Sequence, residues 1–318
     1  MEQKNQRPVP PAGMNMGIPP VTYVYPPDGN VPRTSVLKTI VTIAAAFVGY
    51  VIAQLLGSFV SGFLQLKGYP QQFATAVFIF AALVSVMIFL MKKKKALLTN
   101  GNGFWGGLLT GGFMIYASIS AIMNLFMTVD QKKGKVDYHL PEGDFTFGSE
   151  QVWCILAILL SAGICEELLF RGVVLNALRD CFGKNSFKGT VAAIFTSGIL
   201  FGAMHFINLR AGVPLRVVLI QVVSAAGIGV FLGTVYCRWG NLKVTMFLHF
   251  LMDICVLLPQ SMQKGQDLSE SITETMDNPA KYLGFIIYVG ISIFLLRKSE
   301  RHNLFTYSLD DNVPDPVK

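Results

Sequence analysis

Long apolar runs, each of roughly 20 residues, constrain the fold of this chain more than any other feature. That is the length an α-helix needs to cross the hydrocarbon core of a bilayer. Only 14% of the residues are charged, against about a quarter in soluble domains. We therefore expect an all-α, polytopic membrane protein with about eight transmembrane helices. The runs lie at residues 37–63, 71–91, 104–128, 150–178, 189–207, 213–236, 241–258 and 281–296.

The basic residues predict the orientation of these helices. The chain has a net charge of +7, and most of its 26 Lys and Arg residues fall in alternate loops between the apolar runs. Because positive loops stay on the cytoplasmic side, both termini are predicted to be cytoplasmic. Cations placed beside apolar runs also argue against a nucleic-acid partner.

The composition divides the chain into three predicted regions. Residues 1–35 are rich in proline, which opposes helix formation, and we expect a disordered cytoplasmic tail without a signal peptide. Residues 36–298 form the predicted transmembrane domain, and residues 299–318 form a cytoplasmic C-terminal tail.

The spacing of small residues in GVFLG, at 229–233, favours close helix packing.

The segment EELLFR places two acids and a base inside an apolar run. A charge at bilayer depth costs about 2.5–3.5 kcal/mol or more, so such residues are usually paired or functional. Residues four apart share a helix face, which predicts an ion pair between Glu167 and Arg171. Glu166 is turned about 100° away and has no local partner, so we expect it to be the reactive group.

Two later runs carry further ionisable residues. FGAMH places His205 in the fifth predicted span, one turn after Phe201, and HFLMD places His249 and Asp253 four residues apart in the seventh. Counted along the helices, these side chains reach depths similar to that of Glu166. We therefore expect one shared site within the helix bundle.

Two kinds of chemistry suit such a site. A carboxylate and a histidine away from bulk water can activate a shared water molecule for attack on an amide carbonyl, while a second histidine stabilises the oxyanion. Alternatively, Glu166, His205 and His249 could bind zinc, because two histidines and an acid form a known catalytic set. The sequence contains no HExxH motif, and both alternatives stay open.

The three motifs together resemble the CAAX prenyl endopeptidase and bacteriocin-processing family (CPBP, or ABI) of intramembrane proteases. The family pattern is EExxxR, then FxxxH, then HxxxN or HxxxD, each on its own transmembrane helix. This chain has EELLFR, FGAMH and HFLMD in that order, within a core at 150–258. The resemblance implies an eight-helix protease domain with its site in a membrane cavity open to water.

The resemblance also implies a role for each residue. Glu166 would be the general base and His205 would help to activate the water, without a required cofactor. His249 and Asp253 would stabilise the oxyanion. The prenyl-protein processing members carry Asn where this chain has Asp253, and an ionised Asp cannot donate a hydrogen bond. Glu167 and Arg171 would support the other four.

The leading hypothesis is an intramembrane endopeptidase that cleaves a membrane-associated or lipidated peptide or protein. We expect it in a bacterial cytoplasmic membrane, where a peptide precursor, a pheromone or a bacteriocin-related substrate fits better than a prenylated protein. Two alternatives belong to other classes. One is a catalytically silent scaffold or immunity protein, and the other is a proton-coupled transporter that uses the same residues as a relay.

Overall fold

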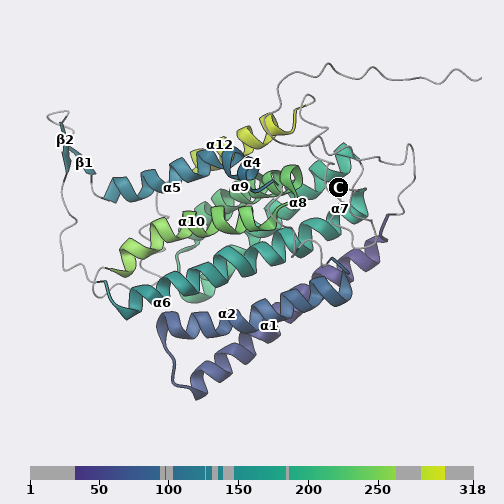
Figure 1. Cartoon of the computed structure of the whole chain (residues 1–318), viewed down its shortest axis with the longest axis horizontal. Helices are drawn as coiled ribbons and strands as arrows, with labels where there is room; N and C mark the ends of the chain where they lie inside the picture. Colours follow the sequence, from purple (N-terminus) through teal and green to yellow (C-terminus); the bar gives the residue numbers. More distant parts are fainter. Residues whose placement is uncertain are drawn as a thin grey trace, which may run out of the picture.

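The computed structural model describes most of the predicted transmembrane domain (Figure 1). It describes residues 33–93, 97, 103–125, 127–130, 135–138, 147–183, 186–262 and 281–297. The predicted proline-rich tail up to residue 32 and the C-terminal tail at 299–318 lie outside the described residues. The two tails therefore stay predictions.

The described elements are almost all helical, which confirms the predicted fold class. In chain order they are α1 (Val36–Phe63), α2 (Gly68–Ser85), η1 (Val86–Leu90), α4 (Phe104–Thr110), α5 (Gly112–Leu125), β1 (Met127–Asp130), β2 (Lys135–Tyr138), α6 (Ser149–Ile158), η2 (Leu159–Glu166), η3 (Leu168–Leu175), α7 (Asn176–Phe182), α8 (Phe187–Met204), η4 (His205–Ala211), α9 (Leu215–Trp239), α10 (Leu242–Ser261) and α12 (Lys281–Leu295).

Six helical stretches of the described chain are long and apolar enough to cross a membrane. They are Val36–Phe63, Gly68–Leu90, Ser149–Phe182, Phe187–Ala211, Leu215–Trp239 and Leu242–Ser261. A seventh is possible if α4 and α5 together form one broken span, and α12 is a shorter apolar helix. Each predicted run thus corresponds to a helix or a helix pair, while the count of eight and the orientation stay predictions.

Two local features differ from the sequence prediction. The run at 104–128 is not one straight helix, because α4 and α5 meet at Gly111 with a bend of 59°. Beyond α5, β1 and β2 form a small antiparallel pair in which Met127 faces Tyr138. The first strand begins within the run predicted at 104–128, so that predicted span ends earlier than expected.

Helix α9 lies at the centre of the bundle, and α1 and α2 lie at one edge (Figure 1). The share of buried residues is largest in α9 and smallest in α1 and α2. Large apolar side chains such as Leu55, Phe59 and Phe63 are exposed along α1. In a membrane protein, an exposed apolar surface of this kind faces lipid, so α1 and α2 supply much of the lipid-facing surface.

Helices α8 and α9 approach closely because glycines line their contact. A methyl group added at Gly229 would lie 2.9 Å from the Cα atom of Gly198. One added at Gly202 would lie 2.4 Å from the carbonyl oxygen of Val222. Gly229 is the first glycine of the GVFLG segment and serves helix packing, as predicted, whereas a methyl group at Gly233 would make only ordinary contacts at 3.5 Å or more.

We expect Gly202→Ala to destabilise the bundle by roughly 1–3 kcal/mol, the usual cost of overpacking a tight contact. The added carbon would meet a backbone oxygen, which can move only if α8 and α9 separate. The measurement is the midpoint of thermal unfolding of the detergent-solubilised protein. Gly49→Ala is the matched control, since an added carbon there meets nothing within 4 Å. Equal midpoints for the two variants would contradict the close-packing argument.

Candidate active site

The backbone around the two adjacent glutamates is π-helical over two consecutive segments, longer than the single π-helical turn η1 that ends the second span. Leu159–Glu166 forms η2 and Leu168–Leu175 forms η3, with Glu167 between them. Helices α6, η2, η3 and α7 nevertheless run as one continuous stretch across the bundle (Figure 1). π-Helical turns are rare and frequently mark functional sites.

Glu167 is the fully buried centre of the site. Its Oε1 atom accepts a hydrogen bond from Arg171 Nη1 at 2.6 Å, the pair expected from their i,i+4 spacing. The same oxygen lies 2.9 Å from Nδ1 of His249 on α10. Since an ionised carboxylate only accepts hydrogen bonds, Nδ1 of His249 carries the proton of this contact. Glu167 therefore holds an arginine and a histidine from two different helices at once.

Arg171 connects this centre to the neighbouring helices. Its Nη2 atom donates a hydrogen bond to the carbonyl oxygen of Gly229 on α9 at 3.2 Å. Its guanidinium carbon lies 4.8 Å from the ring centroid of Phe201 on α8. The arginine thus contacts a carboxylate, a backbone carbonyl and an aromatic ring, three partners that stabilise a desolvated guanidinium.

The free nitrogen of His249 faces the two remaining acids. Nε2 lies 3.9 Å from Oε2 of Glu166 and 3.6 Å from Oδ2 of Asp253. An unprotonated ring nitrogen would be repelled by two ionised carboxylates at these distances. We infer that this group holds a proton, on Nε2 or on one of the facing carboxyl groups.

His205 lies beside the same group and, as predicted, within the fifth apolar stretch, Phe187–Ala211. The α-helix α8 ends at Met204, and His205 begins the 3-10 helix η4 that continues this stretch. Its Nδ1 atom is 3.1 Å from the carbonyl oxygen of Phe201, one of the last carbonyls of α8. Because a carbonyl only accepts, Nδ1 is the donor, and Nε2 of a neutral His205 is left as an acceptor.

Phe201 separates the two imidazoles and holds both by edge-to-face contacts. Its ring centroid is 5.4 Å from that of His205 and 5.5 Å from that of His249. Asp253 interacts electrostatically with both histidines. The structure therefore brings all six predicted residues into one neighbourhood, from η2, η3, α10 and the junction of α8 with η4.

The side chains differ in their access to solvent. The side chain of Glu167 is 0% exposed and that of His249 is 6% exposed. Those of Glu166 and Asp253 are 21% and 29% exposed. Two carboxylates adjacent in sequence thus have different surroundings, one sealed in the bundle and one partly exposed.

The predicted zinc ligands do not form a recognisable metal site. Among the described residues, no group of three or more His, Cys, Asp and Glu side chains has the geometry to hold a metal ion. Nδ1 of His249 is already engaged by Glu167, and Nδ1 of His205 by a backbone carbonyl. The zinc alternative stays a prediction.

Two contributors to the site were not identified from the sequence. Phe201 was noted as the first residue of the FxxxH motif without a role in the site, and Gly229 only as a packing residue. Their roles depend on contacts with Arg171 and His249, which lie on other helices. An aromatic residue four positions before a histidine was the only local signal for Phe201.

Comparison with known proteins gives one match. Residues 148–255 match the family model described as type II CAAX prenyl endopeptidase Rce1-like. Searches of curated proteins and of solved structures gave no match.

The matched segment begins just before α6 and ends within α10. It therefore contains Glu166, Glu167, Arg171, His205, His249 and Asp253, on the helices that meet at the site. The match covers the part of the chain that carries the three motifs, and it agrees with the family that those motifs indicate. Residues 148–255 are thus similar to a CAAX-type family of intramembrane proteases.

Proposed function

We propose that this protein is an intramembrane endopeptidase that hydrolyses a peptide bond with water activated by Glu166 and His205. The observation that carries the proposal is the position of His249. Its Nδ1 is anchored by the buried Glu167, and its Nε2 faces the accessible carboxylates of Glu166 and Asp253. A fixed imidazole beside a reachable carboxylate is the arrangement that acyl-transfer chemistry requires.

In the first step, Glu166 takes a proton from a water molecule as the oxygen attacks the peptide carbonyl carbon. His205 positions that water, because the contact of its Nδ1 with the Phe201 carbonyl leaves Nε2 free to accept the second hydrogen bond. The attack forms the bond from oxygen to carbon and moves the carbonyl electron pair onto the oxygen.

His249 then stabilises the resulting oxyanion by donating its Nε2 proton in a hydrogen bond. Because Glu167 fixes the ring through Nδ1, this donor is already in place when the charge develops. Collapse of the intermediate breaks the bond from carbon to nitrogen, and protonated Glu166 returns its proton to the leaving amine. Atoms and charge balance without a further reactant.

Asp253 acts through His249 in this scheme. Its Oδ2 lies 3.6 Å from Nε2, and an ionised Asp favours the protonated imidazole that donates to the oxyanion. It cannot itself donate to the oxyanion unless it is protonated. We therefore assign Asp253 as a positioning residue.

The proposed substrate is a membrane-associated or lipidated peptide, cleaved within the bundle of a multi-pass membrane protein. The accessible carboxylates of Glu166 and Asp253 are where its scissile bond would lie. For a bacterial cytoplasmic membrane, which is our proposed location, a peptide precursor suits this site better than a prenylated protein.

Glu166→Gln should lower the cleavage rate by about 10²–10⁴-fold, because the amide keeps the shape of the side chain but cannot accept the proton. The assay uses the purified full chain in detergent with a panel of fluorogenic peptides. Glu150→Gln is the matched control, since Glu150 is an exposed acid in the first turn of α6.

The same assay is run with and without a chelator. Activity that resists the chelator and disappears in Glu166→Gln is the expected result. Full activity in Glu166→Gln would exclude the proposed base, and loss of wild-type activity with chelator, restored by zinc, would replace the metal-free mechanism.

Asp253→Asn should keep cleavage within about tenfold of wild type, because Asn preserves the shape and adds a hydrogen-bond donor toward the oxyanion. Asp253→Ala should be slower than Asp253→Asn, since it removes the group facing Nε2 of His249. The measurement is kcat and KM for both variants on one cleaved peptide. An Asn variant as impaired as the Ala variant would show that the charge of Asp253 is required.

These variants also separate the two alternative functions. A scaffold or immunity protein would keep its cellular phenotype in Glu166→Gln. A proton-coupled transporter would show ion flux in proteoliposomes that Asp253→Asn abolishes. Neither outcome is expected of a peptidase.

A further inference from the structure

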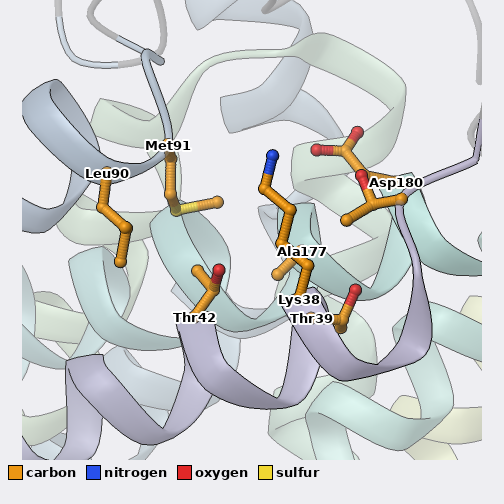
Figure 2. Close-up of a pocket in the computed structure, with 8 residues that line it drawn as sticks. Lys38, Thr39, Thr42, Leu90, Met91, Ala177 and Asp180 are labelled. Carbon is orange, nitrogen blue, oxygen red and sulfur yellow. The ribbon is translucent and has the colours of Figure 1, made fainter.

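A cavity of about 60 Å³ lies at the end of the bundle where α1 begins, apart from the candidate active site (Figure 2). Figure 2 shows Lys38 and two threonines of α1 on one side, Leu90 and Met91 at the end of η1 on another, and Ala177 and Asp180 of α7 closing the third. A water molecule needs about 10–15 Å³ of such space, so the cavity admits a larger group.

A buried hydroxyl without a partner lies in the wall of this cavity. Thr39 is 4% exposed, and its Oγ1 atom has no hydrogen-bond partner among the described residues. Leaving a buried polar atom unpaired carries a cost of about 1–3 kcal/mol. Thr39 therefore keeps an unused hydroxyl proton in the cavity wall, and Thr34 and Thr42 line the same space.

The charges around the cavity favour an anion. The carboxylate of Asp180 is already paired with Lys93, whose Nζ lies 3.1 Å from Oδ2. Lys38 has no ion-pair partner within the described ranges and lines the cavity. The guanidinium of Arg33 packs against Gly183, just beyond the end of α7. The first turn of α1, a helix of 28 residues, adds its positive dipole end.

The rim of the cavity is continuous with the apolar surface that faces lipid. Leu37 is 72% exposed and Leu90 is 45% exposed, on the two elements that flank the opening. A ligand with acyl chains could lie along this surface with its charged group inside. Basic pockets between helices at a membrane surface are a common place for anionic lipid head groups.

We propose that this cavity binds a phosphate group, and that its ligand is the head group of an anionic phospholipid. Lys38 supplies the charge, and Thr39 donates its unused hydroxyl proton to a phosphate oxygen. Leu37 and Leu90 contact the beginning of the acyl chains. The site is independent of peptide hydrolysis, so Glu166→Gln should bind this ligand as the wild type does.

The test titrates the purified full chain, in an uncharged detergent, with dioctanoyl phosphatidylglycerol and follows the thermal unfolding midpoint. Dioctanoylglycerol tests the acyl chains without phosphate, and inorganic phosphate tests the anion without chains. We expect a saturable rise in the midpoint with phosphatidylglycerol and none with dioctanoylglycerol. A rise with inorganic phosphate alone would support the phosphate site and identify a soluble anion as its source.

Two variants locate the binding. Lys38→Gln should weaken the apparent affinity for phosphatidylglycerol about tenfold, the effect of losing one charge-assisted hydrogen bond. Thr39→Val should weaken it about fivefold, while the midpoint without ligand stays level or rises because the unpaired hydroxyl is gone. Lys243→Gln, at an exposed lysine in the first turn of α10, should leave the affinity unchanged.

Two results would overturn the proposal. One is an equal rise in the midpoint with dioctanoylglycerol and with phosphatidylglycerol, which would show that the chains alone bind. The other is wild-type affinity in both Lys38→Gln and Thr39→Val, which would place any phosphate site elsewhere. The Thr39→Val variant keeps the shape of the side chain, so a folding defect cannot imitate loss of binding.

Discussion

One carboxylate oxygen, Oε1 of Glu167, organises the centre of this protein. It accepts from Arg171 and from His249, and Arg171 in turn bonds to the carbonyl of Gly229. Removing these charges from water is costly, and a buried pair is tolerated only when its hydrogen bonds are well made. The contacts tie η3 to α9 and α10, so the position of His249 is fixed by the same interactions that neutralise the buried charge.

The two adjacent glutamates differ in burial because of this arrangement. The side chain of Glu167 is fully buried, and its carboxylate is paired with Arg171 and His249. Glu166 remains partly exposed beside Nε2 of His249. In the proposed mechanism, the general base needs access to substrate, while the residue that orients the imidazole needs protection from water. The π-helical segments η2 and η3 meet at this point and present the two side chains to different surroundings.

The charged residues at the end of the bundle where α1 begins are arranged differently from those of the candidate active site. There the ion pair of Lys93 with the partly exposed Asp180 neutralises one carboxylate, and Lys38 lines an open cavity together with the threonines of α1. In the active site, the polar groups bond mainly to one another. Each place also keeps buried polar atoms without a hydrogen-bond partner among the described residues, namely Oε2 of Glu167 and Nε of Arg171 in the candidate active site and Oγ1 of Thr39 in the cavity wall.

Local rules were sufficient for much of this protein. Apolar length alone indicated the helices, and i,i+4 spacing alone indicated the pair of Glu167 with Arg171, because both depend on interactions within one helix. The contact of Glu167 with His249 spans 82 residues, so local spacing could not predict it. Local spacing also did not predict the bend at Gly111 or the change to a 3-10 helix at His205. These features depend on how far each helix is rotated and how closely it approaches its neighbours. That is decided by packing between helices, which only the tertiary structure contains.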